Sequence, residues 1–145
     1  MSDTPIRTQH PPPQHVAVPL LFFGLLIGPA AWSLQLVTNY ALAAYRCYPD
    51  DMPRATILPN WHWSSPTILA INVIAAILAL VGAAISVQNW RAARAEEGAS
   101  ISETLGEGVG RTAFLALWGI MTGLGFFAAI IFDTIALSMV PQCSG

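Results

Sequence analysis

The sequence predicts an all-α protein: a bundle of three transmembrane helices with a cytoplasmic N-terminus and an outside C-terminus. Of its 145 residues, 10% are charged and 54% are hydrophobic, and the mean hydropathy is +0.56. A soluble domain of this length has a large surface to cover with polar side chains, and this composition cannot supply them. Three apolar stretches are long enough to cross a bilayer core, which takes about 20 helical residues. Period-2 alternation is absent from them, so a membrane β-barrel is disfavoured.

The chain divides into an arm and one membrane domain. Residues 1–15 contain Pro11-Pro12-Pro13 and are predicted to form an extended cytoplasmic arm. Residues 16–145 form a single membrane domain with spans at about 19–45, 67–89 and 112–140.

The first span carries a helix breaker and two amides. Gly28-Pro29 lies inside it, where proline must kink a helix and free a carbonyl upstream. Gln35 and Asn39 are four residues apart and therefore share one helix face. A proline-rich polar loop follows at 45–66 and ends in Trp61-His62-Trp63, whose aromatic rings are typical interfacial anchors.

The second and third spans carry small-residue stripes. Ala75, Ala79 and Ala83 follow one another at helical spacing in the second span. The third span contains a GxxxG pair, Gly119 and Gly123, which lets helix backbones approach within the protein or against a partner. Between these spans, residues 90–111 carry most of the charge and several glycines, and are interpreted as a solvated connector.

Orientation follows from the arginines, because cytoplasmic loops carry the excess of positive charge. They divide four to two between the two sides: Arg7, Arg91, Arg94 and Arg111 against Arg46 and Arg54. This bias places the N-terminus and the second connector of this multi-pass protein in the cytoplasm.

The two cysteines fall on the same, outer face. Cys47 lies two residues past Tyr45 and Cys143 three past Val140, so both sit just outside the hydrocarbon at matching depth. A structural disulfide between them is predicted on the oxidising side. The alternative is a soft-metal site for Cu(I), in which Cys47, Cys143 and His62 would be ligands together with Met52. No compact metal motif supports that alternative.

Four polar side chains lie in the outer half of the spans: Gln35, Asn39, Asn72 and Asp133. At 1.5 Å per residue, Gln35 and Asn39 lie roughly 9–15 Å below the outer end of their helix. The first interpretation is a packing clasp in which the amides bond across helices and Asp133 is neutral or reaches Arg46. The alternative is a polar path, or a quinone or proton site.

With these motifs in place, the sequence resembles a family of small uncharacterised bacterial inner-membrane proteins associated with gene neighbourhoods of haem-copper cytochrome oxidases. The resemblance covers most of residues 20–143. Its motifs are Gly28-Pro29-Ala-Ala-Trp32, Asn39-Tyr40, Cys47, Arg111-Thr-Ala-Phe114 and Pro141-Gln-Cys143. Asp133 is not part of this pattern. The resemblance implies an accessory or assembly role beside a respiratory oxidase.

The residues themselves predict no enzyme. There is no Ser/His/Asp set within reach, no HExxH and no phosphate-binding loop, so no catalytic residue and no cofactor are expected. The net charge of −2 offers no basic field for nucleic acid. We expect a non-catalytic accessory or assembly subunit that lies in the lipid bilayer and joins a larger membrane complex. The alternatives are a small homo-oligomeric carrier or channel, and a protein that handles copper or haem at the outer face.

Overall fold

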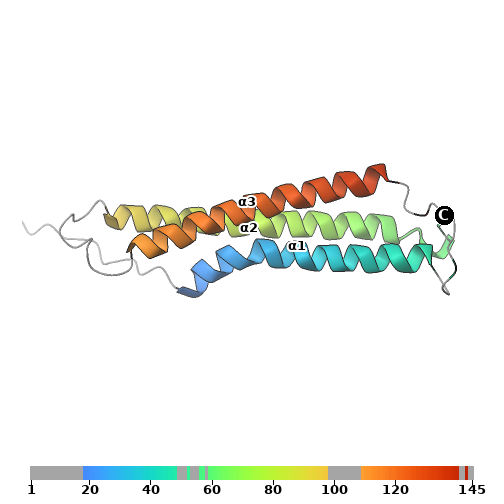
Figure 1. Ribbon diagram of the computed structural model, residues 1–145, viewed down its shortest axis with the longest axis horizontal. Coiled ribbons are helices and arrows are strands. Elements are labelled where there is room, and N and C mark those ends of the chain that lie inside the picture. The colour runs from blue at the N-terminus through green and yellow to red at the C-terminus, as the bar shows by residue number, and fades with distance from the viewer. Residues whose placement is uncertain are drawn as a thin grey trace, which may run out of the picture.

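The computed structural model describes residues 18–48, 52, 56, 57, 59–97, 109–140 and 143. Three long helices run side by side: α1 (Val18–Cys47), α2 (Ser64–Glu97) and α3 (Val109–Met139), with a 3-10 turn, η2 (Pro59–Trp61), before α2 (Figure 1). The described residues contain no strand, which confirms an all-α three-helix bundle. The arm predicted at 1–15 lies outside the described residues.

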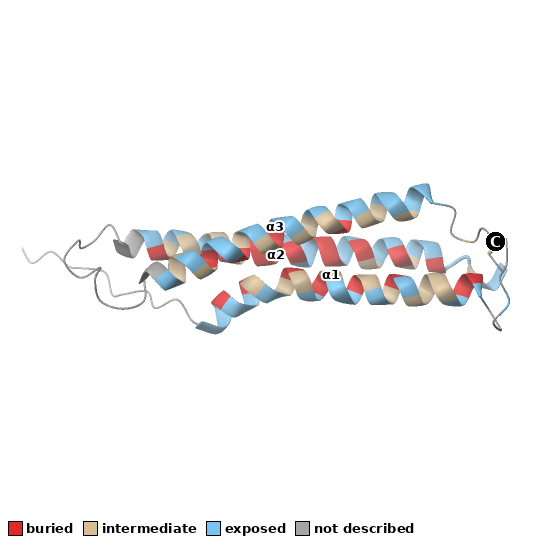
Figure 2. Ribbon diagram, in the orientation of Figure 1, coloured by how far each residue is buried: buried red, intermediate tan, exposed pale blue. Residues whose placement is uncertain are grey.

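All three helices are long and apolar enough to cross a membrane, as judged from length and composition. Figure 2 shows buried positions where the helices face one another and exposed positions around the outside. The exposed positions include many large apolar side chains, such as Leu34, Phe114 and Phe132. In water this surface would be unfavourable, whereas lipid tails are as apolar as the side chains themselves.

The core between the helices is made of small side chains. Alanines of α1 and α2 pack against one large residue of α3, with two half-buried aromatic rings beside them: Ala31, Ala75, Ala76, Ala79, Ile130, Trp32 and Phe127. Small side chains let the three backbones approach closely, so packing is tight although no large apolar cluster forms.

Pro29 lies inside α1 and leaves a backbone carbonyl of that helix without its usual donor. A threonine of α3 approaches this carbonyl. Proline has no N–H to donate to the carbonyl four residues upstream, which here is that of Leu25. Thr122 Oγ1 of α3 lies 3.5 Å from that Leu25 oxygen and 2.9 Å from the carbonyl of Trp118. Figure 1 shows the blue N-terminal part of α1 bent away from the line of the rest.

Gly119 and Gly123 lie inside the bundle. A Cβ added at Gly119 would collide with Ser86 Oγ of α2, and one added at Gly123 would lie 2.9 Å from Ala83 Cβ. A Cβ at Gly28 of α1 would lie 3.4 Å from Gly123 Cα. The stripe therefore packs α3 against both other helices of the same chain, rather than against a partner.

Both ends of α2 differ from those predicted, and α3 begins at Val109 rather than at about 112. The helix α2 begins at Ser64, before Pro66, because proline is tolerated in the first turn where its missing N–H has no helical partner. It continues past the apolar stretch to Glu97, through residues that were interpreted as connector. Alanine and arginine there are strong helix formers, and the Arg94 guanidinium lies 4.7 Å from the centre of the Trp90 ring.

Candidate functional site

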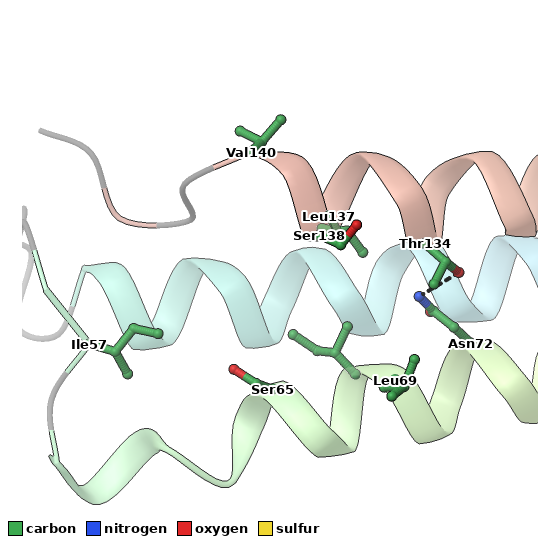
Figure 3. A pocket seen from close by; sticks show the side chains of 9 residues that line it. Ile57, Ser65, Leu69, Asn72, Thr134, Leu137, Ser138 and Val140 are labelled. Atoms are coloured by element: carbon green, nitrogen blue, oxygen red, sulfur yellow. Dashed lines mark hydrogen bonds between the residues drawn. The ribbon is translucent and has the colours of Figure 1, made fainter.

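Three polar side chains form one chain of hydrogen bonds across the bundle, and we call them the polar clasp: Asn39 of α1, Asn72 of α2 and Thr134 of α3. Asn39 Nδ2 donates to Asn72 Oδ1 at 2.7 Å, and Asn72 Nδ2 donates to Thr134 Oγ1 at 3.1 Å. Figure 3 shows the second of these bonds. The two asparagines are 4% and 2% exposed. One continuous chain of hydrogen bonds therefore crosses all three helices.

The clasp is satisfied at Asn72 and Thr134. The Thr134 hydroxyl accepts from Asn72 and donates its own proton to the Ile130 carbonyl at 2.7 Å. The remaining Asn39 Oδ1 is buried and has no hydrogen-bond partner. A clasp of this kind fixes the relative height of the helices, since sliding any one of them breaks a buried bond.

The other two residues of the predicted cluster do not join this chain of bonds. Gln35 lies one turn from Asn39 and is 1% exposed, with neither amide atom hydrogen-bonded. Asp133 is half-buried, and its buried Oδ2 has no partner. Thr134, its neighbour in the chain, takes the place that the sequence analysis gave to Asp133.

Arg46 bonds to serines of α2 rather than to Asp133, the partner considered from the sequence. Its Nη1 donates to Ser64 Oγ and Ser65 Oγ, both at 3.3 Å, at the start of α2. The guanidinium is 0% exposed, and its Nε and Nη2 have no hydrogen-bond partner. Ser64 Oγ donates in turn to the Trp61 carbonyl at 2.7 Å, which ties η2 to the first turn of α2.

Next to Arg46, a disulfide joins Cys47 to Cys143, with an S–S distance of 2.02 Å and a Cα–Cα distance of 5.3 Å. This confirms the predicted pairing. We call this end of the bundle the disulfide end; there Cys143, which follows α3, is bonded to the last residue of α1.

The disulfide disfavours the alternative Cu(I) site, because that site needs the thiolates of Cys47 and Cys143. Both cysteine sulfurs are used in the disulfide, and it is the thiolate that binds metal. Met52 and His62 are exposed. Among the residues that the structure describes, no three His, Cys, Asp or Glu side chains are grouped so as to hold a metal ion.

Two pockets lie beside the clasp. The first, about 430 Å³, lies between α2 and α3 near the disulfide end, with lining residues that include Ser65, Leu69, Asn72 and Thr134 (Figure 3). The second, about 240 Å³, lies between α1 and α2, and Gln35 and Thr38 are among its lining residues. Both are lined largely by aliphatic side chains, so each is suited to apolar matter with few polar contacts.

Three functional side chains were not singled out from the sequence: Thr134, Ser64 and Ser65. A hydroxyl within an apolar span most often bonds its own helix four residues back, so Thr134 gave no separate signal. The one indication that the sequence offered for this contact was the position of Thr134 along its helix, which is level with Asn72 in the structure. The chain matches no protein-family model, no curated protein and no solved structure.

Proposed function

We propose that this protein is a non-catalytic accessory or assembly subunit of a larger membrane complex. The observation that carries the proposal is the polar clasp, because its side chains bond one another across the bundle. Buried amides used in this way serve helix association. The role that fits them is to hold a rigid three-helix unit together.

The rest of the bundle supports the same role. Gly119 and Gly123 of α3 pack against the other helices of the chain, and the disulfide ties α1 to the segment after α3. Large apolar side chains cover the outside, where lipid or the helices of a partner can pack. A preformed unit of this kind can join a larger complex without reordering its own helices.

A respiratory oxidase is the first candidate partner, on the strength of the sequence resemblance described above. The test is purification of the tagged protein from its native membrane in mild detergent, followed by identification of retained proteins. The same tag on an unrelated three-span protein is the control. Stoichiometric retention of a larger complex, absent from the control, would support the proposal. A pure homo-oligomer that conducts ions in liposomes would contradict it and favour a carrier or channel.

The proposed location is the bacterial inner membrane, with the disulfide end outside. Two arguments support it: the four-to-two distribution of arginines, and the disulfide, which forms and persists in an oxidising compartment. A phosphatase fused after Gly145 should be active and one fused after Gly98 silent. The opposite pattern would reverse the orientation, and activity at both positions would contradict three spans.

A further inference from the structure

The disulfide end contains a buried positive charge without a counter-charge among the described residues. Arg46 is 0% exposed, its only hydrogen bonds go to the neutral hydroxyls of Ser64 and Ser65, and no described carboxylate pairs with it. Nε and Nη2 have no partner. A charge removed from water in this way is unfavourable unless an anion accompanies it.

A second positive end lies against the same guanidinium. The 34-residue helix α2 begins at Ser64, and its first turn contains no acidic residue. The N-terminus of a helix carries a partial positive charge of about half an elementary charge and attracts phosphate and carboxylate groups. Arg46 and the start of α2 therefore repel one another unless an anion lies near both.

An apolar pocket lies next to Ser65, and Arg46 is connected to the pocket through that residue rather than lining it. Ser65, which accepts from Arg46, also lines the pocket of about 430 Å³ between α2 and α3. Figure 3 places Ser65 at one end of it and the Asn72–Thr134 bond at the other. The walls between them carry aliphatic side chains, among them Ile68, Leu69 and Leu137. One end of the pocket therefore attracts anions, and the rest of it is an apolar groove.

We propose that this pocket binds an anionic phospholipid. Its phosphodiester accepts a hydrogen bond from Ser65 Oγ, the guanidinium of Arg46 supplies the counter-charge, and an acyl chain lies in the groove between α2 and α3. The site lies where the apolar spans end, which is the level of lipid headgroups. Free phosphate would satisfy the charges but would leave the aliphatic walls of the groove unfilled. The site does not depend on the proposed subunit role.

The test measures lipid binding to delipidated, oxidised protein in detergent by native mass spectrometry and thermal shift. Dioleoyl phosphatidylglycerol should bind and stabilise the fold, whereas dioleoyl glycerol, which lacks the phosphate, and inorganic phosphate alone should do neither. Ser65→Ala should weaken phosphatidylglycerol binding about tenfold, since a hydrogen bond to a charged group is lost. Ser65 is exposed and Arg46 Nη1 keeps its hydrogen bond to Ser64, so this variant should keep the fold.

Two matched variants of α2 test the groove. Leu69 lines the pocket and Ile77 does not, and both are 54% exposed. Leu69→Trp should fill the groove and abolish phosphatidylglycerol binding, while Ile77→Trp should leave it unchanged. Equal effects of the two substitutions would overturn the acyl-chain position.

Three further results would overturn the proposal. Equal binding of dioleoyl glycerol and phosphatidylglycerol would show that the phosphate is not recognised. Stabilisation by inorganic phosphate that Ser65→Ala removes would assign the site to the free anion. Phosphatidylglycerol binding that appears only after Asp50→Asn with Asp51→Asn, both positions outside the described residues, would show that these carboxylates already neutralise Arg46 in the native chain.

Discussion

Replacement of Asn72 by alanine tests the polar clasp most directly. It removes two hydrogen bonds, the 2.7 Å bond from Asn39 and the 3.1 Å bond to Thr134. A hydrogen bond between membrane helices contributes about 0.6 kcal/mol on average and up to about 1.7 kcal/mol. The free energy of unfolding should therefore fall by about 1–3 kcal/mol. Thr134 keeps its bond to the Ile130 carbonyl, so the only group newly unpaired is Asn39 Nδ2.

The decisive measurement is a double-mutant cycle with Asn39→Ala. Since the Asn39–Asn72 bond is lost in both single variants, the double variant should cost less than their sum by about 0.6–1.7 kcal/mol. The assay is reversible unfolding in mixed micelles followed by far-ultraviolet circular dichroism, with every variant kept oxidised. Asn89→Ala is the control, because Asn89 is also buried in α2 but its Nδ2 has no partner. Additivity of Asn39→Ala and Asn72→Ala within about 0.5 kcal/mol would refute a clasp.

Three other substitutions give separate predictions. Cys143→Ser should lower the free energy of unfolding by about 4.7 kcal/mol through chain entropy, because the disulfide spans 96 residues; equal stability of wild-type protein with and without reductant would contradict this. Gly123→Ala should destabilise the bundle in the same unfolding assay, because the new methyl group meets Ala83, whereas Gly125→Ala, with nothing within 4 Å, should be neutral or stabilising by about 0.5–1 kcal/mol. Asp133→Asn should preserve folding and helicity, since its buried Oδ2 has no hydrogen bond to lose; a large fall in thermal stability would show an ionised, paired carboxylate.

Depth along a helix could be predicted from the sequence, and direction around the helix could not. The rise per residue places Cys47 and Cys143 at one height, and a disulfide needs little more than that from two flexible ends. The same arithmetic grouped Asn72 with Asp133. Successive helical residues point about 100° apart, so the side chain that reaches Asn72 is that of Thr134.

Helix ends were predicted less well than helix cores for a related reason. Hydropathy marks where the apolar stretch stops, whereas the helix stops where backbone hydrogen bonding stops. Along α2 these points differ, because charged residues and alanines after Trp90 are good helix formers in water. Likewise the GxxxG pattern predicted that helices approach closely, but it did not identify the residues that the glycines face, which are Ser86 for Gly119 and Ala83 for Gly123.

The covalent closure at the disulfide end has a consequence for the order of assembly. Because Cys143 follows α3, the bond to Cys47 can form only after the third helix is in place. It therefore cannot guide the meeting of α1 and α2, which are joined directly by the Asn39–Asn72 bond and by the alanines between them. Disulfide formation then stabilises a bundle that has already assembled. It lengthens the lifetime of the assembled state but does not determine which helices pair.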